Sequence, residues 1–155
     1  MGCSALRKLS VLLFVVLLFG CAPITEQTGT RTVVTLDRCI DGDTAWFYPI
    51  GKARFLYIDT PEVYPQMQPY GQEAADYTCD RLSEGKVIQI EYDGKREDDY
   101  GRQLVWVWVD GRLLQEELAR LGYVKRLYDY GDYRYERRVD DAIKDAKKNN
   151  AGIYQ

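Results

Sequence analysis

Hydrophobic and polar residues alternate in several short runs along the first two thirds of the chain. A period of two is the pattern of β-strands that bury one face, and β-branched and aromatic residues are typical of such strands. The clearest run is 103–109, where three valines alternate with Leu104, Trp106 and Trp108. The pattern predicts strands over residues 32–40, 44–48, 52–58, 87–92 and 103–109.

A helical spacing of apolar residues predicts three helices, over residues 70–82, 113–121 and 136–149. Gly85 and Gly122 follow the first two, at positions where glycine commonly ends a helix. One of the helices lies between the third and the fourth strand. This order predicts a β-barrel with helices (α+β), a five-stranded OB-fold barrel with about three helices, the last two packed beside it.

The N-terminus has the pattern of an export signal. Arg7 and Lys8 precede an apolar run over residues 9–19, which has the length of a signal-peptide core and is short for a bilayer span. The run ends in L-F-G-C at 18–21, which resembles a bacterial lipobox and implies lipidation of Cys21. An ordinary cleaved signal peptide and an uncleaved anchor are the alternatives.

The expected organisation is therefore a signal peptide over residues 1–20, a polar tether over 21–32 and one folded domain over 33–155. The chain is expected to be exported and membrane-anchored as a lipoprotein of a bacterial cell envelope, or else secreted or periplasmic. Cys39 and Cys79 would remain after processing. In an oxidising compartment they would either form a disulfide or remain as two buried free thiols.

Composition restricts the chemistry. The sequence has no histidine, which excludes Ser-His-Asp and Cys-His catalysis, histidine-based zinc motifs and nuclease mechanisms with a histidine base. Hydrolysis would have to rely on carboxylates, arginines, tyrosines and metal. The formal net charge is −3, and loss of Arg7 and Lys8 with the signal would leave 19 basic against 24 acidic residues, a charge of −5.

The stretch from Asp41 to Glu62 concentrates the candidate chemistry. It reads D-G-D-T at 41–44 and R-F-L-Y-I-D-T-P-E at 54–62, and a hairpin of the two strands would bring Asp41 and Asp43 opposite Asp59 and Glu62. Clustered carboxylates repel each other unless a positive charge lies among them. A hard divalent cation, which prefers oxygen ligands, and the nearby Arg54 are the candidates.

Several separated motifs, in order, resemble the staphylococcal (thermo)nuclease family. They are I-D-G-D-T at 40–44, R-F-L-Y-I-D-T-P-E at 54–62, Y-G at 70–71, D-D-Y-G-R at 98–102 and W-V-D-G-R-L-L-Q-E-E-L-A-R-L-G-Y-V at 108–124. The resemblance runs from about Val33 to Tyr154. It implies a Ca²⁺-dependent nuclease that hydrolyses phosphodiester bonds in DNA, and also RNA, with low sequence specificity and a preference for single strands.

The resemblance also implies roles for particular residues. Ca²⁺ would be bound by the carboxylates of Asp43 and Asp59 and by the main-chain carbonyl of Thr60. Glu62 would be the general base, and Arg54 and Arg102 would hold the scissile phosphate. The remaining expected site residues are three tyrosines that would contact the nucleotide: Tyr100, Tyr128 and Tyr130.

The physical chemistry of each residue type is consistent with these roles, since an arginine fork matches two phosphate oxygens and a phenol ring stacks on any base. Taken singly, each residue also has a structural interpretation: the aspartates as turn residues, the arginines as solvated charges and the tyrosines as packing. Their joint occurrence favours the active site. The alternative function is a non-catalytic module that binds nucleic acid or a cell-envelope partner.

Three departures from the family pattern bear on substrate binding. Asp99 stands where the family often has a lysine, the loop 63–69 contains no lysine, and the domain is acidic. Non-specific affinity for nucleic acid comes largely from Lys and Arg. We therefore expect substrate capture that is weaker and more salt-sensitive than the family pattern implies, with a local positive patch limited to Arg54, Arg102, Lys125 and Arg126.

Overall fold

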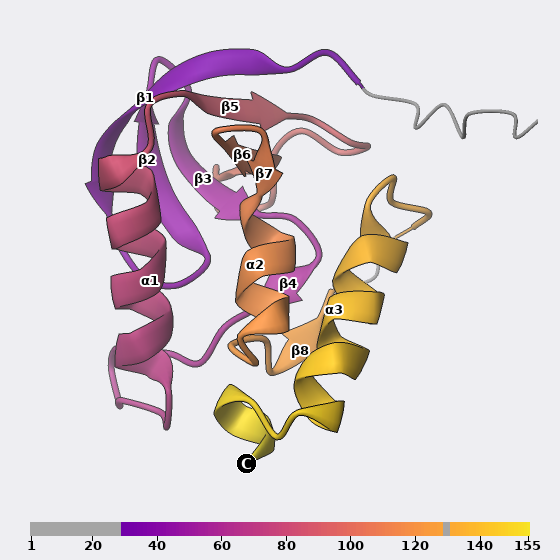
Figure 1. The fold of residues 1–155 in the computed structure, drawn as a ribbon. Coiled ribbons are helices and arrows are strands. Elements are labelled where there is room, and N and C mark those ends of the chain that lie inside the picture. The colour runs from indigo at the N-terminus through magenta and orange to yellow at the C-terminus, as the bar shows by residue number, and fades with distance from the viewer. Residues whose placement is uncertain (1–28, 129–130) are drawn as a thin grey trace, which may run out of the picture.

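The computed structural model of the chain describes residues 29–128 and 131–155 (Figure 1). The expected signal peptide, Cys21 and Tyr130 lie outside these residues. No helix within the described part of the chain is both long and apolar enough to cross a membrane.

The predicted barrel is confirmed. Its sheet has the order β3-β2-β1-β5-β6-β7, and β3 also pairs with β6 in parallel, which closes five of these strands into a mixed barrel. The strands are β1 Thr32–Cys39, β2 Thr44–Tyr48, β3 Gly51–Phe55, β5 Ile88–Glu91, β6 Gln103–Val109 and the short β7 Arg112–Leu113.

The third strand differs from the prediction, because the expected run over 52–58 is broken. After β3 the chain turns at Tyr57, which has a left-handed backbone (φ 72°), and continues as β4 Ile58–Asp59. The Tyr57 side chain is buried against Trp106 and Tyr133, with ring centroids 6.3 and 6.0 Å apart. Tertiary packing thus overrides the local strand pattern.

The strand β4 then pairs with β8 Arg126–Leu127 in a separate two-stranded sheet. The sequence indicates only an irregular segment there. Through this pairing β4 contacts the C-terminal part of the chain and lies outside the barrel sheet.

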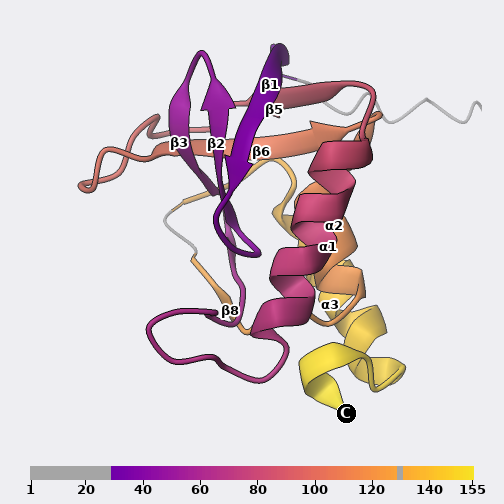
Figure 2. The same cartoon turned by 90° about the vertical axis from the view of Figure 1, so that its left-hand side faces the viewer.

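The three predicted helices are present within one or two residues of their expected ends, as α1 Gly71–Glu84, α2 Leu114–Arg120 and α3 Glu136–Lys148, followed by a 3-10 turn over Gly152–Tyr154. The helices α2 and α3 pack on each other beside the barrel (Figure 1). In Figure 2 the β4–α1 loop and the β5–β6 hairpin project on the same side of the molecule, away from α3.

The strand β6 is buried on both faces. Its valines face the barrel core, while Trp106 and Trp108 face the helices and lie edge-on to the ring of Tyr135, with centroids 5.5 and 5.0 Å away. Such aromatic pairs add to the free energy gained by burial. The barrel and the helical layer therefore share one continuous core.

Of the two possibilities for the cysteines, the structure contains free thiols. Cys39 lies at the end of β1 and Cys79 in α1, and both are partly buried. Burial, together with a hydrogen bond to Cys79, raises the pKa of Cys39 to about 12. The two thiols are thus neighbours across the β1–α1 contact.

Candidate active site

The loop before β2 is fixed by its own backbone and by α1. The backbone N–H groups of Ile40 and Asp41 donate to the carbonyl of Thr44, at 3.1 and 3.3 Å. Thr78 of α1 donates its hydroxyl to the carbonyl of Gly42 at 2.8 Å. Gly42 has no room for a side chain, because an added Cβ would lie 2.6 Å from Thr60 Oγ1. Asp43 is therefore presented at a fixed position.

Asp41 acts within this loop. Its Oδ1 accepts the backbone N–H of Asp43 at 3.0 Å. Burial, followed by the charge of Asp43, raises the pKa of Asp41 to about 6. This carboxylate shapes the turn rather than facing Asp59 across a hairpin.

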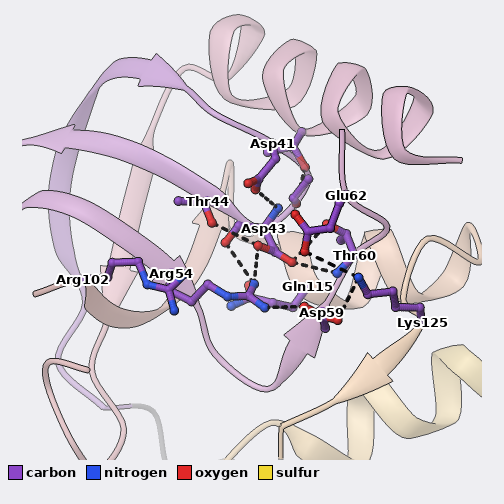
Figure 3. A network of polar contacts seen from close by, with 12 residues as sticks. Asp41, Asp43, Thr44, Arg54, Asp59, Thr60, Glu62, Arg102, Gln115 and Lys125 are labelled. Atoms are coloured by element: carbon purple, nitrogen blue, oxygen red, sulfur yellow. Dashed lines mark hydrogen bonds and ion pairs between the residues drawn. The ribbon is translucent and has the colours of Figure 1, made fainter. Parts of the chain in front are cut away.

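Asp43 is buried and connects the two sequence motifs directly (Figure 3). Its Oδ2 accepts hydrogen bonds from the backbone N–H and the hydroxyl of Thr60, at 2.7 and 3.0 Å. Its Oδ1 accepts the Thr44 hydroxyl at 3.0 Å. The D-G-D-T segment and the D-T-P-E segment therefore form one constellation.

Arg54 lies between the two buried aspartates. Its guanidinium forms an ion pair with Asp43 and donates from Nη2 to Asp59 Oδ1 at 2.9 Å. All three side chains are buried. Because an unpaired buried charge is costly, the arginine offsets the repulsion that the carboxylates would otherwise exert on each other.

Glu62 differs from the aspartates in its exposure. Its side chain is 44% exposed, on the loop between β4 and α1. The loop is held by Gln68, whose backbone N–H donates to the Glu62 carbonyl at 2.9 Å and whose side-chain oxygen accepts the Glu62 N–H at 3.0 Å. A carboxylate held in this way is accessible to water.

Lys125 completes the cluster, although the sequence indicates it only as part of a positive patch. Its Nζ lies 3.2 Å from Asp59 Oδ2 and 3.5 Å from Glu62 Oε1, and donates to Gln68 Oε1 at 3.1 Å. Its backbone N–H donates to the carbonyl of Asp59 at 2.9 Å. No sequence signal places Lys125 here, because its position depends on the pairing of β4 with β8.

Arg102 lies just before β6, on the side of Arg54 away from Lys125 in Figure 3. It donates from Nε to Asp98 Oδ2 at 2.7 Å, and Asp98 Oδ1 accepts the backbone N–H groups of Tyr100 and Arg102, both at 2.9 Å. Partial burial opposes ionisation of Asp98, but the hydrogen bonds from Arg102 hold its pKa below the usual range. Arg102 is thus oriented by its own loop.

The expected tyrosines occupy different surroundings. Tyr128 donates its backbone N–H to Tyr57 at 2.8 Å, and its ring lies 5.7 Å from the guanidinium carbon of Arg54. Tyr100 is 86% exposed on the β5–β6 hairpin, 5.5 Å from the guanidinium carbon of Arg102. The structure places one tyrosine beside each arginine, and Tyr130 is outside the described residues.

The donors available for a metal ion are oxygens. Asp43 and Asp59 offer carboxylates and Thr60 a main-chain carbonyl, which suits a hard cation such as Ca²⁺. Among residues 29–128 and 131–155, no three carboxylate, cysteine or histidine side chains are grouped to hold a metal. A cation here would therefore share its shell with water and would compete with Arg54 and Lys125 for the aspartate oxygens.

The arrangement can accept a phosphodiester. Two guanidinium groups supply forked donors for phosphate oxygens, and an accessible carboxylate lies on the loop next to them. No histidine is needed for any of these contacts.

Comparisons with known proteins point the same way. The family described as "Staphylococcal nuclease homologue" matches residues 52–155. A protein named "Thermonuclease" from Staphylococcus hyicus is 39% identical over 123 residues, which cover 76% of this chain and 72% of that protein. "Thermonuclease" from Staphylococcus intermedius is 33% identical over 137 residues, covering 84% and 80%. "Endonuclease YncB" from Bacillus subtilis (strain 168) is 40% identical over 115 residues, covering 70% and 54%.

Proposed function

The chain belongs to the staphylococcal nuclease family, and we propose that it is an exported, lipid-anchored, Ca²⁺-dependent nuclease of low sequence specificity. As a member of this family it is a nuclease, a hydrolase that acts on phosphodiester bonds in nucleic acid. The metal, the preference for single strands, the export and the anchor belong to the proposal.

The observation that carries the catalytic proposal is the bridge of Arg54 between Asp43 and Asp59. It shows that a buried positive charge and two buried carboxylates share one site. A phosphate entering this site would exchange with the carboxylates as a partner of Arg54, and Arg102 would bind it from the other side. The two forks would then stabilise the charge that develops on the phosphate oxygens.

Ca²⁺ would be held by Asp43, Asp59 and the Thr60 carbonyl, and would supply a further positive charge beside the phosphate. Glu62, accessible to water and fixed by Gln68, would accept a proton from the attacking water. Lys125 keeps the Glu62 carboxylate on the side of the loop that faces Asp59.

Low sequence specificity is supported by the types of group at the site. Guanidinium groups contact phosphate, which carries no sequence information, and the rings of Tyr100 and Tyr128 can stack on any base. Bases are free to stack in this way when they are unpaired, which supports a preference for single strands or frayed ends.

The proposal of export and anchoring rests on the positive residues, apolar run and L-F-G-C sequence that precede the described domain. If Cys21 carries lipid, Cys21→Ser should move the protein from the membrane to the soluble fraction. Equal membrane association of the two forms would show that the lipobox interpretation is wrong.

The catalytic proposal is tested with the full chain, single-stranded DNA and Ca²⁺, then with excess chelator. We expect cleavage that chelator abolishes. Glu62→Gln and Arg102→Ala should each lower kcat/KM about 100-fold, near 3 kcal/mol of transition-state stabilisation, whereas Lys86→Ala, far from the site, should match the wild type.

Absence of cleavage with every divalent metal would favour the non-catalytic module instead. Cleavage that persists in chelator would show that the reaction does not need a metal ion. The activity of Arg102→Ala would then test the role of the arginines.

A further inference from the structure

One exposed face of the barrel carries an aromatic and cationic surface that the active site does not use. On this face the strand β2 places Trp46 opposite Arg38 of β1 on one side and Lys52 of β3 on the other. Residues directly opposite each other in a sheet point to the same face. Because Ala45 and Phe47 point into the core, Trp46 and its two neighbours point outward.

Contacts confirm that this row is assembled. The guanidinium carbon of Arg38 lies 4.3 Å from the centre of the Trp46 ring, within the range of a cation–π interaction. Arg38 also pairs with the neighbouring Asp37, at 2.6 Å. Two residues further along β2, Tyr48 is 74% exposed on the same face. The row therefore presents two aromatic rings and two cations.

The exposure of Trp46 sets it apart from the other tryptophans. Trp106 and Trp108 are 0% and 2% exposed, as expected for a large apolar side chain in a core, whereas Trp46 is only partly buried. A partly exposed tryptophan flanked by cations on the outer face of a strand has no packing role that the core requires. It is a typical arrangement for stacking on a ligand.

The row is continuous with the active site. Thr44 of β2 pairs with Arg54 of β3, and Trp46 pairs with Lys52, so the two pairs are successive steps along the same strands and the same face. Two residues along a strand correspond to roughly 7 Å. Arg102 lies just before the neighbouring strand β6, whose first residue Gln103 pairs with Ala53.

A ligand that starts at Arg54 and Arg102 would therefore meet Lys52 and Trp46 next, and Tyr48 beyond them. A single nucleic-acid strand offers what this path can bind, namely a phosphate at each step and a flat base beside it. Cations supply the attraction for the phosphates and the rings supply stacking. Charge complementarity and continuity with the site favour this ligand over a lipid surface or a protein.

We propose that Arg38, Trp46, Tyr48 and Lys52 form a platform for the part of a single-stranded nucleic acid that extends beyond the scissile phosphate, with Trp46 stacking on a base and Arg38 and Lys52 contacting phosphates. The inference rests on the proposed function, since it extends the same substrate. The two cations of the platform would add to the phosphate contacts of Arg54 and Arg102.

The fluorescence of Trp46 tests this directly, because the other two tryptophans are buried. The full chain is titrated in chelator with an oligothymidylate about twelve nucleotides long, within the range of site sizes of such folds, and with a thymidine dinucleotide. We expect quenching by the long strand, little by the dinucleotide, and none in Trp46→Ala. No quenching, or quenching that persists in Trp46→Ala, would overturn the proposal.

Affinity of a labelled oligothymidylate provides the second readout. Trp46→Ala should weaken binding about tenfold, the usual value for one lost stacking contact. Lys52→Ala, at a polar surface position, should weaken binding and reduce the slope of log affinity against log salt by about one. Lys86→Ala on another face is the matched control. Wild-type affinity and salt slope in Lys52→Ala would count against the platform.

The two proposals can fail separately. Platform binding without cleavage under any metal would refute the nuclease mechanism and keep the platform. Cleavage with equal KM for long strands in wild type, Trp46→Ala and Lys52→Ala would refute the platform and keep the nuclease. Quenching of Trp46 by anionic lipid vesicles but not by oligothymidylate would assign the surface to the membrane instead.

Discussion

The four carboxylates between residues 41 and 62 differ in what lies against them. Asp43 and Asp59 are buried and bridged by Arg54, Glu62 is partly exposed beside Lys125, and Asp41 caps its own loop. Removing one partner from a buried ion pair costs about 3–5 kcal/mol, because the other charge is left unpaired. A substitution of Arg54 would therefore lower both the stability of the fold and the catalytic rate. A substitution of Arg102 is the better test of catalysis alone.

Lys125 should compete with a metal ion for the carboxylate of Asp59. Its Nζ forms ion pairs with Asp59 Oδ2 and Glu62 Oε1. A cation that binds Asp59 must therefore displace the ammonium group or bind against its repulsion. Lys125→Met should bind Ca²⁺ about tenfold more tightly, because a partly exposed ion pair is worth about 1 kcal/mol and a tenfold change in affinity is about 1.4 kcal/mol. Isothermal titration without substrate measures this affinity.

The matched control is Arg126→Met, the adjacent residue, which should leave the affinity for Ca²⁺ near the wild-type value. Equal Ca²⁺ affinity in wild type and Lys125→Met would show that the ammonium does not compete for the site.

Asp98 gives a pH-dependent prediction. Its folded pKa is lower than its unfolded value, so its contribution to stability is present above pH about 4 and is lost as the pH falls through the folded pKa. Asp98→Asn should lower the free energy of unfolding by about 1 kcal/mol at neutral pH, with a difference that shrinks below pH about 4.

Urea unfolding at several pH values measures this difference. The control is Asp141→Asn, which removes a solvent-exposed pair with Lys144 and should change little. A loss of stability in Asp98→Asn that stays constant down to the lowest pH would contradict the assignment.

At the scale of elements, the loop before β2 and the strand break at Tyr57 bring the site together. The loop can approach Thr60 because residue 42 has no side chain, and an added Cβ would also lie 2.9 Å from Ala74 Cβ of α1. Gly42→Ala should push the loop away from Thr60 and Ala74 and lower the free energy of unfolding by about 1–3 kcal/mol. The cleavage rate should fall further than the smaller fraction of folded protein explains.

Thermal unfolding and cleavage of single-stranded DNA, measured on the same preparation, separate these two effects. Thr78→Val is the comparison, since it removes the hydroxyl that holds the Gly42 carbonyl without adding bulk. Full activity in Gly42→Ala would mean that the close approach of the loop to Thr60 is not needed.

The local pattern predicted most elements, because the core-facing residues of a strand or helix recur with its period. Both the five barrel strands and the three helices follow from it. The break at Tyr57 could not be predicted, since Phe55 to Ile58 reads as a continuous strand. Its left-handed backbone is stabilised by Trp106 and Tyr133, which are distant in sequence.

At the scale of the whole molecule, Glu91 joins three parts of the chain. It is fully buried in β5, accepts the Tyr135 hydroxyl at 2.9 and 3.1 Å and the Gly29 N–H at 2.7 Å, and pairs with Arg31 and Arg134. These contacts connect the first described residues, the barrel and the start of α3.

Tyr135→Phe should therefore lower the free energy of unfolding by about 1 kcal/mol, the net value of one hydrogen bond. Glu91→Gln should lower it by about 3 kcal/mol or more, because two arginines would lose their counter-charge. Urea unfolding followed by tryptophan fluorescence measures both. A larger loss in Tyr135→Phe than in Glu91→Gln would show that the hydroxyl, and not the charge, holds these parts together.

The sequence by itself determined the elements, the barrel and the residue types of the site, because periodicity and short motifs are local properties.

Only the tertiary structure decided how the parts meet. The ion pairs of Lys125 depend on the β4–β8 pairing, the Arg54 bridge on the backbone turn at Tyr57, and the row of Arg38, Trp46 and Lys52 on the register of three strands. Register and long-range pairing are set by side chains far apart in sequence, so no local pattern could specify which charges would face each other.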